Sequence, residues 1–341
     1  IDLMADVYFQ NSEDYRPLII FSYGGDFGSQ GRKARDVVHL CEELAKEGFV
    51  CAAIDYRTNF NFLGNPEREM YRTAFRGMTD VKTAINYFYT GALGENVYNI
   101  SHEAIYVGGI SIGALLALES AFIDSERELT TNMLSVLRNE LEDNPIHKSH
   151  LRGVISLCGG NTSLPSISGT TDLSLCLIHG QKDKFIPIDS GTFSYQGIKT
   201  IPLYGSGSIH NKALEQGHRS FLYSFGNASH VPWSSDWSYL DSSLEFIKEF
   251  LVKDLALLSH GELYQISTNY QLVYPNPFCN VLYTKGITVG TEIKIIDIYG
   301  KVSVFQVASF NSISTHFLSP GIYIVSWGTG DRLRKTTLVK N

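Results

Sequence analysis

Gly109-Ile110-Ser111-Ile112-Gly113 lies between an apolar run at residues 104–108 and a second apolar run that begins at Ala114. The first run has the pattern of a buried strand and the second that of a helix, so the five residues predict a tight turn. In a G-x-S-x-G turn the glycines permit close backbone approach, and the serine hydroxyl projects. The following helix directs free N–H groups to the same place. Ser111 is therefore predicted to be a nucleophile, with the Ile112 N–H as one oxyanion donor. A purely structural turn can have the same sequence pattern and is the alternative.

Buried strands and amphipathic helices alternate on both sides of this turn. Apolar runs indicate an edge strand at residues 3–9 and buried strands at 17–23, 49–54, 153–158, 173–179 and 220–225. Helical spacing indicates helices near residues 37–48, 74–88, 114–118, 124–141 and 240–251. Such alternation is typical of a mostly parallel sheet covered by helices, so residues 1–255 are predicted to form an α/β domain. The helix at 124–141 could be either a cap over the site or an ordinary packing helix.

The pattern changes after residue 255. We expect a linker at residues 256–269 and a second domain at 270–341, because 341 residues exceed the size at which one core usually stops growing. Apolar residues in the last part alternate with period two, as at Ile293 and Ile295, and no helical spacing returns. Short alternating strands with glycine punctuation predict a small antiparallel β-sandwich.

Charge and cysteine content narrow the class of function. The formal net charge is -7 and the sequence pI is about 5.8, which argues against nucleic acid as the principal partner. No apolar stretch approaches the roughly 20 residues of a transmembrane helix. The five cysteines have no C-x-x-C spacing, so we expect buried free thiols and no metal site, with a single bridge left open.

A serine nucleophile needs a base within hydrogen-bond reach and a third group that orients the base. Side chains that follow strands are the candidates, because ligands bind at the carboxyl ends of parallel strands. This selects Asp183 as the acid and His230 as the base, in the order Ser, Asp, His that is typical of α/β hydrolases. Asp189 is the alternative acid. Three other histidines have different expected roles: His210 and His218 are expected to face solvent, and His179 to be a structural hydrogen-bonding residue.

The loop after the strand at 17–23 is where a second oxyanion donor should lie. Gly24 and Gly25 permit close approach of the backbone to a ligand, so the amides of Gly25 or Asp26 are the candidates, with a plain tight turn as the alternative. Four side chains near these points are predicted substrate contacts: Tyr23, Phe27, Ile110 and Trp233. They indicate an apolar or aromatic cleft.

Residues 1 to about 255 resemble the carboxylesterase branch of the α/β-hydrolase family. The segment 23–27 (Tyr-Gly-Gly-Asp-Phe) is similar to its H-G-G-G-F loop, 55–57 (Asp-Tyr-Arg) to its D-Y-R strand end, and 179–187 to its H-G-x-x-D-x-x-V-P acid loop. Two residues depart from the family pattern. Tyr23 stands where His is usual, and Ile110 stands where His or Glu is usual. The resemblance implies an α/β-hydrolase fold and an esterase-like or lipase-like activity that needs no cofactor.

The last 70 or so residues resemble a type IX secretion sorting domain, the Por-type C-terminal signal of Gram-negative bacteria. The matching motifs, in order, are Tyr274-Pro275-Asn276-Pro277-Phe278, Tyr299-Gly300-Lys301-Val302, residues 320–325 and the basic end 335–340. The resemblance implies that the type IX machinery exports the protein to the cell surface or medium. A carbohydrate-binding module is the alternative for this domain, whose only tryptophan is Trp327.

The sequence thus predicts a secreted serine carboxylic ester hydrolase that works through an acyl-enzyme. Export indicates a bulky or polymeric ester: an acetylated or feruloylated polysaccharide, a lipid, or a polyester such as cutin or PET. A peptidase of the same fold and a catalytically silent surface-binding protein are the alternatives.

Overall fold

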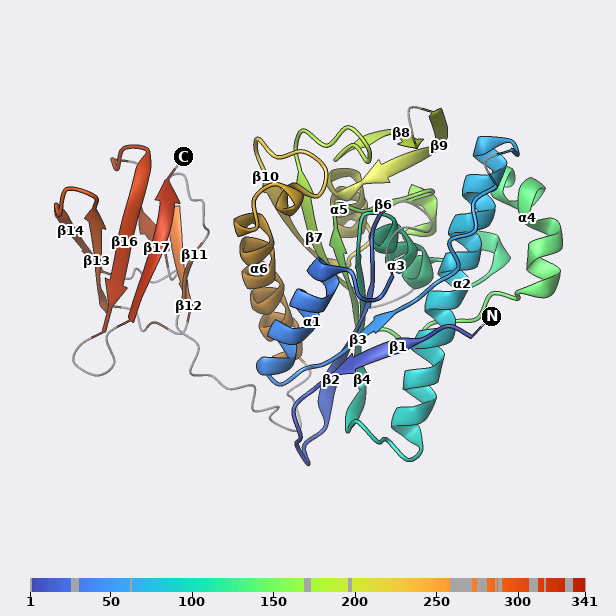
Figure 1. Ribbon diagram of the computed structural model, residues 1–341, viewed down its shortest axis with the longest axis horizontal. Helices are drawn as coiled ribbons and strands as arrows, with labels where there is room; N and C mark the ends of the chain where they lie inside the picture. Colours follow the sequence, from blue (N-terminus) through green and yellow to red (C-terminus); the bar gives the residue numbers. More distant parts are fainter. Residues whose placement is uncertain are drawn as a thin grey trace. The chain divides into compact units, whose positions relative to one another are not determined.

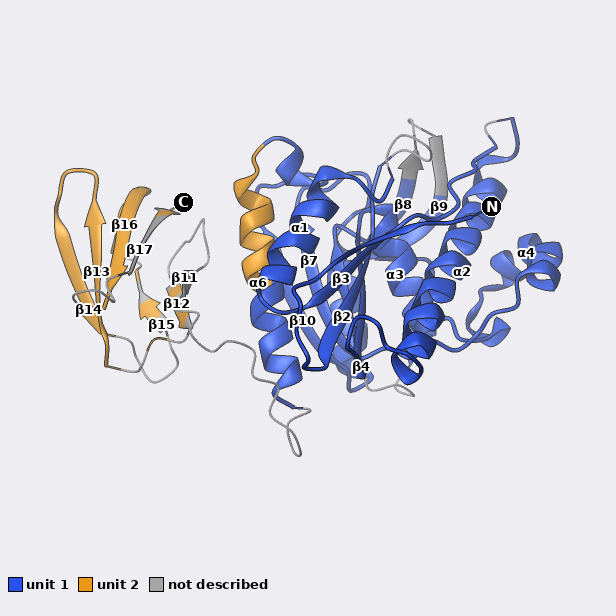
Figure 2. Cartoon of the chain, turned by 60° about the horizontal axis from the view of Figure 1, so that its bottom comes forward, with its two compact units in different colours: residues 1–235, 247–264 blue, residues 236–246, 265–341 orange. Residues whose placement is uncertain are grey.

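The computed structural model describes most of the chain, namely residues 2–25, 31–61, 63–168, 173–195, 198–257, 272–274, 281–285, 287, 290–306, 312–315, 317–328 and 334–340. The chain divides into two compact units, which Figure 2 colours separately: residues 1–235 with 247–264, and residues 236–246 with 265–341. Each unit is described by itself. The domain limits 1–255, 256–269 and 270–341 stay predictions.

A seven-stranded sheet forms the centre of the first unit (Figure 1). Its order is β1-β3-β2-β4-β5-β7-β10, and only β1, at the edge, pairs antiparallel. The strands are β1 (Ala5–Tyr8), β2 (Arg16–Ser22), β3 (Val50–Ile54), β4 (Ile100–Ile110), β5 (Gly153–Leu157), β7 (Ser174–Gly180) and β10 (Arg219–Phe225). The residues of β2, β3, β5 and β7 are all buried, as expected for strands covered on both faces. The predicted α/β class with a mostly parallel sheet is confirmed.

Helices flank this sheet (Figure 1): α1 (Arg35–Lys46), α2 (Pro66–Leu93), α3 (Ile112–Phe122), α4 (Thr131–Asp143), α5 (Ser206–Glu215) and α6 (Ser238–Leu255). Every residue of α3 is buried, because α3 lies between the sheet and α2. Helix α2 begins where the side chain of Asn65 accepts from the Arg68 N–H, and Pro66 follows at the first helical position. None of the helices in the described part of the chain is long and apolar enough to cross a membrane.

A small antiparallel sheet and one helix were not predicted from the sequence. Strands β6 (Gly160–Asn161), β8 (Ser190–Tyr195) and β9 (Ile198–Gly205) pair in the order β6-β9-β8, and α5 follows β9 directly. The first residues of α5 are Ser-Gly-Ser, a composition that favours a loop. Tertiary contacts therefore override local propensity in this segment.

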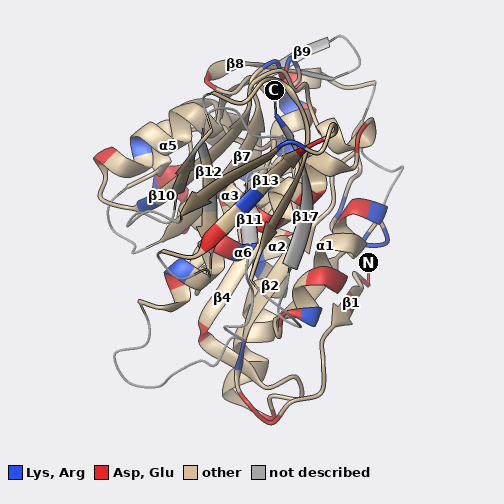
Figure 3. Ribbon diagram, turned by 90° about the vertical axis from the view of Figure 1, so that its left-hand side faces the viewer, with Lys and Arg blue, Asp and Glu red and all other residues tan. Residues whose placement is uncertain are grey.

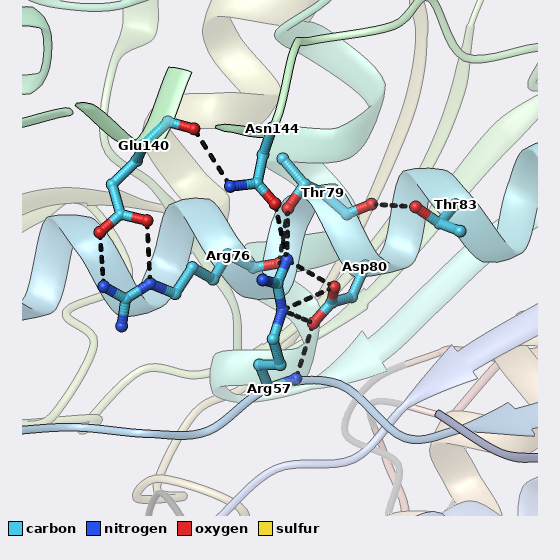
Figure 4. A network of polar contacts seen from close by, with 7 residues as sticks. All are labelled: Arg57, Arg76, Thr79, Asp80, Thr83, Glu140 and Asn144. Atoms are coloured by element: carbon cyan, nitrogen blue, oxygen red, sulfur yellow. Dashed lines mark hydrogen bonds and ion pairs between the residues drawn. The ribbon is translucent and has the colours of Figure 1, made fainter. Parts of the chain in front are cut away.

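Helix α4 is fastened to α2 by polar contacts (Figure 4). The Arg76 guanidinium pairs with the Glu140 carboxylate, with Nε 3.1 Å from Oε2. Arg57 donates to Asn144 Oδ1 at 3.2 Å, at the end of α4. On the apolar side Leu137 is fully buried. These contacts favour an ordinary packing helix over a cap for the segment 124–141.

The second unit contains two antiparallel sheets. One has the order β11-β12-β15 and the other β14-β13-β16-β17, with β11 (Leu272–Tyr274), β12 (Val281–Lys285), β13 (Glu292–Asp297), β14 (Val302–Gln306), β15 (Ser312–Ser314), β16 (Gly321–Trp327) and β17 (Arg334–Lys340). Ile293 and Ile295 alternate with exposed neighbours and pack with Val325 and Trp327 in one core. The predicted antiparallel sheet domain is confirmed. Trp327 is 4% exposed, so its ring serves the core and offers no platform for a sugar.

Charged residues of both signs are mixed along the chain, and the described cysteines are buried. Acidic and basic residues are interspersed along the ribbon in the view of Figure 3. Cys41, Cys51, Cys158 and Cys176 are buried free thiols, as predicted, and Cys279 lies outside the described residues.

One buried carboxyl group on α3 should make stability depend on pH. Glu119 is fully buried; burial raises its pKa to about 7, although the Thr162 hydroxyl donates to it. In the part of the chain that the structure describes, its Oε2 has no hydrogen-bond partner. The unfolded chain ionises near the ordinary value of 4.5, so the folded state is destabilised as pH rises from there through 7.

We therefore expect Glu119→Gln to stabilise the protein at pH 8 by on the order of 3 kcal/mol. Glutamine keeps the shape and the acceptor for Thr162 but cannot ionise. Thermal unfolding at pH 8 and pH 5 checks this: the variant should melt several degrees higher at pH 8 and close to the wild type at pH 5. Equal melting temperatures at pH 8 would contradict it.

Candidate active site

The turn between β4 and α3 holds Ser111 in a backbone conformation that few residues adopt. Its φ is 55° and its ψ is -117°, and its N–H donates to the Leu157 carbonyl at 2.8 Å. A Cβ at Gly109 would lie 2.3 Å from the Gly113 carbonyl carbon, and a Cβ at Gly113 would lie 2.3 Å from the Ser22 carbonyl oxygen. Both glycines of the motif are therefore required by contacts with backbone. The turn presents the hydroxyl at the carboxyl end of the central strand.

His230 lies in the loop after β10 and reaches this hydroxyl. Its Nε2 is 2.7 Å from Ser111 Oγ, and its Nδ1 is 2.6 Å from Asp183 Oδ2. An ionised carboxylate can only accept, so Nδ1 carries a hydrogen and, in the neutral ring, Nε2 is free to accept from the serine. The structure thus brings together the three residues predicted as nucleophile, base and acid.

Asp183 lies in the loop after β7, and its side chain is fully buried. Its Oδ1 accepts from the backbone N–H groups of Phe185 and Ile186, each at 2.9 Å. Burial raises the pKa of this carboxyl group, but hydrogen bonds from His179 and His230 outweigh burial and lower the pKa to about 2. The carboxylate is therefore ionised throughout the neutral range.

One predicted oxyanion donor, Ile112, directly follows the serine, and the loop that carries Gly25 packs against the nucleophile turn through Gly24. Ile112 is the first residue of α3, so its N–H is one of the free N–H groups at the helix start. A Cβ at Gly24 would lie 2.8 Å from the Ile110 carbonyl oxygen and 3.2 Å from Ser111 Cβ, so this loop packs against the nucleophile turn. Gly25 has a φ of 112°, which a side chain would disfavour. Asp26 lies outside the described residues.

The predicted substrate contacts are mostly buried side chains. Tyr23 is 4% exposed and stacks on Tyr56 with ring centroids 4.5 Å apart. Ile110 is 1% exposed. Trp233 is 3% exposed, and its Nε1 donates to Asp36 Oδ2 on α1 at 3.0 Å. Each could meet a substrate only through a small edge, and their contacts with substrate stay predictions. Phe27 lies outside the described residues.

The rival acid and the rival bases have other neighbours. Asp189 lies beside the start of α5, where a Cβ at Gly207 would be 2.5 Å from its Oδ1. His210 Nδ1 lies 2.8 Å from Ser220 Oγ. The expectation that His218 faces solvent was wrong: it is 4% exposed, and its Nε2 is 2.7 Å from the Ser168 carbonyl oxygen.

Two neighbours of the site were missed in the sequence. The ring of Phe185 lies 5.3 Å from that of His230 and is 54% exposed. Cys158, at the end of β5, has a φ of 53° and is fully buried near Asp183. The available signals were the position of Phe185 two residues after the acid and the position of Cys158 directly after a buried strand.

Cys158, Asp183 and His230 are also the one set of possible metal ligands among the described residues. One ligand atom of each lies within 4.8 Å of the others. A metal would need the thiolate, but burial and the charge of Asp183 raise the pKa of Cys158 to about 12. Asp183 and His230 already share a hydrogen bond of 2.6 Å. These donors fit a hydrogen-bonded acid and base better than a metal centre.

We expect Gly113→Ala to destabilise the protein by about 3 kcal/mol and to reduce ester hydrolysis at least about tenfold, because the new Cβ meets the Ser22 carbonyl. Gly91→Ala on α2 is the matched control: its Cβ meets nothing within 4 Å, so it should stabilise by about 0.5 kcal/mol. Guanidinium unfolding followed by helical circular dichroism checks both. A Gly113→Ala protein as stable and active as the wild type would show that the turn is not packed as described.

Comparison with protein families gives two matches. Residues 5–160 match BD-FAE, an esterase-type α/β-hydrolase domain, and residues 272–341 match the secretion system C-terminal sorting domain. None of the curated proteins compared with the chain matches it.

Similar solved structures include esterase 2 of the Planctomycetes species Thermogutta terrifontis. Its propionate-bound form has a TM-score of 0.53 and 19% identity, covering 74% of this chain and 90% of that chain. The butyrate-bound form has a TM-score of 0.54 and 19% identity, covering 77% and 92%. The form phosphorylated by paraoxon has a TM-score of 0.52 and 18% identity, covering 74% and 89%. At these identities the likeness concerns the fold.

The fold and both family matches lead to one assignment. The sorting domain directs the protein by type IX export to the surface or the surroundings of a Gram-negative cell. The chain thus contains an esterase-type α/β-hydrolase domain, matched over residues 5–160, and a secretion sorting domain, matched over residues 272–341.

Proposed function

We propose that this esterase uses Ser111, His230 and Asp183 as a catalytic triad. The observation that carries the proposal is the chain of hydrogen bonds from Ser111 Oγ to His230 Nε2, 2.7 Å, and from His230 Nδ1 to Asp183 Oδ2, 2.6 Å. A neutral imidazole in this position can take the serine proton, and the ionised Asp183 stabilises the imidazolium that forms.

The reaction then follows the course of acyl transfer. Ser111 Oγ attacks the ester carbonyl carbon while His230 takes the serine proton. The carbonyl oxygen becomes an anion, for which the N–H groups of Ile112 and Gly25 are the proposed donors. His230 returns the proton to the leaving alcohol, which leaves an acyl-serine. Water, activated by the same histidine, hydrolyses this ester and restores the free enzyme.

The substrate is proposed to be a bulky or polymeric ester outside the cell. Export supports a molecule too large to import: a polysaccharide with acetyl or feruloyl groups, a lipid, or a polyester such as cutin or PET. The propionate and butyrate bound by the similar esterase support a carboxylic acyl group. Acid released from arabinoxylan, triglyceride and polyester film by the wild type, with Ser111→Ala as the blank, would rank the three classes.

We expect Ser111→Ala to remove essentially all hydrolysis of p-nitrophenyl butyrate, a loss of about 10⁴-fold or more, because no other group supplies the nucleophile. Ser135→Ala, at an exposed position on α4, is the matched control and should keep full activity. The wild type should also show a burst of nitrophenol when deacylation is slower than acylation.

The same assays separate the alternatives. Cleavage of aminoacyl nitroanilides without ester turnover would favour a peptidase. Inertness toward both, in a folded wild-type protein, would favour a surface-binding protein. Undiminished activity of Ser111→Ala would refute the proposed nucleophile.

Phe185 offers an apolar surface at the rim of the site, since its ring is 54% exposed and lies beside His230. We expect Phe185→Ala to lower kcat/KM for p-nitrophenyl benzoate about tenfold and for the acetate much less, because a ring-sized contact is worth about 1 to 2 kcal/mol. Tyr87→Ala, at an exposed ring on α2, is the control. An equal loss on both esters would show that Phe185 does not select the substrate.

A further inference from the structure

The carboxylate of Asp183 is approached by a second histidine. His230 Nδ1 lies 2.6 Å from Oδ2, and His179 Nε2 lies 3.3 Å from the same oxygen. His179 is the penultimate residue of β7 and is fully buried. Two imidazole nitrogens therefore face Oδ2 of Asp183, while Oδ1 accepts hydrogen bonds from backbone N–H groups.

The neighbours of His179 decide which of its ring nitrogens carries the hydrogen. Nε2 lies 2.8 Å from the Ile186 carbonyl oxygen, which can only accept, so Nε2 is the donor. Nδ1 lies 2.8 Å from Ser206 Oγ, whose hydroxyl can donate to it. The Nε2–H thus bonds the Ile186 carbonyl, and Asp183 Oδ2 lies 3.3 Å from the same nitrogen as a second, longer contact. The Ile186 N–H donates to Asp183, which closes the turn between these two residues. The His179 ring therefore contacts both the first and the last residue of this turn.

We propose that His179 is a positioning residue of the reaction, which donates to the carboxylate oxygen that binds His230 and so sets both the orientation of Asp183 and the basicity of His230. The inference rests on the proposed function, because it needs His230 as the base. His179 touches neither Ser111 nor the place of the substrate carbonyl; it acts through Asp183.

Charge sharing gives the direction of the effect. A carboxylate oxygen that accepts from two donors holds each less strongly than one that accepts from a single donor. Removing the His179 donor concentrates the charge toward His230, stabilises its imidazolium and raises its basicity. The titratable groups around Asp183 are His179 on β7, His230 after β10 and the Cys158 thiol after β5. Burial raises the pKa of that thiol and keeps it neutral, so it adds no charge beside the carboxylate.

Two amide variants separate positioning from packing. In His179→Asn the side chain can still meet Ser206 but is too short to reach Asp183, whereas in His179→Gln an amide N–H can take the place of Nε2–H. We expect the acid limb of kcat/KM against pH, measured with p-nitrophenyl butyrate, to move up by about 0.5 pH unit in the Asn variant. Its kcat should fall about tenfold because Asp183 is held less firmly. The Gln variant should return the acid limb to the wild-type position.

His218→Asn is the matched control, because it also removes a buried histidine that binds a backbone carbonyl. It should lower the melting temperature without moving the acid limb. An unmoved acid limb in His179→Asn, or equal shifts in the Asn and Gln variants, would overturn the inference while Ser111→Ala stays inactive. Activity in Ser111→Ala would instead overturn the proposed function.

A measurement on the wild-type protein does not depend on the folding of any variant. Ring ¹⁵N spectra should show His179 as the Nε2–H tautomer, because both of its ring contacts require it. The Nδ1–H tautomer would leave Asp183 without this donor and would contradict the proposal.

Discussion

The strained backbone of Ser111, with its positive φ, is the constraint on which the site depends. A non-glycine residue with a φ of 55° costs roughly 1 to 2 kcal/mol, and the turn keeps it because its surroundings leave no other path. The Ser111 N–H is bound to the Leu157 carbonyl, and its own carbonyl accepts from the Leu115 N–H at 3.0 Å. Backbone of β2 fills the space that a side chain at Gly113 would need. The position of the hydroxyl is thus fixed by three neighbouring strands and a buried helix, rather than by the serine rotamer alone.

Backbone hydrogen bonds join the loop that carries the acid to the loop that carries the base. The N–H groups of Gln181 and Lys182, just before Asp183, donate to the carbonyls of Phe225 and Ala228, at 3.0 and 2.9 Å. A Cβ at Gly180 would lie 2.4 Å from the Ser229 carbonyl oxygen, so the loop of the base runs directly over the end of β7. The short contact between carboxylate and imidazole is therefore set by pairing of neighbouring loops. This explains how residues 47 positions apart keep a distance of 2.6 Å.

Sequence patterns predicted the sheet and the three reacting residues because both are local signals. A strand buried on both faces is a continuous apolar run, as in β7, and a side chain that follows such a run must lie at the edge where ligands bind. The environment of a side chain is not local, and there the predictions failed. His218 lies in a polar stretch, yet the ring of Phe122 from α3, 5.7 Å away, helps to bury it. Helix α5 begins with small polar residues that favour a loop in isolation. It forms because it packs against strands β7, β9 and β10.

Strain is concentrated around the reacting groups. Five non-glycine residues in the described part of the chain have a positive φ: Asn96, Asn99, Ser111, Cys158 and Val231. Asparagine tolerates this conformation, whereas the β-branched Val231 is a true outlier, and it directly follows His230. The Cys158 sulfur lies within 4.8 Å of ligand atoms of Asp183 and His230, so it packs between the loops of acid and base. The three strained positions other than the asparagines therefore gather beyond the ends of β4, β5 and β10, around the reacting groups. Each is held by a backbone hydrogen bond to a different neighbour: the Ser111 N–H donates to Leu157, the Cys158 N–H to Ile178 at 2.7 Å, and the Val231 carbonyl accepts from Ser234 at 3.0 Å. These separate bonds explain why the strained conformations persist.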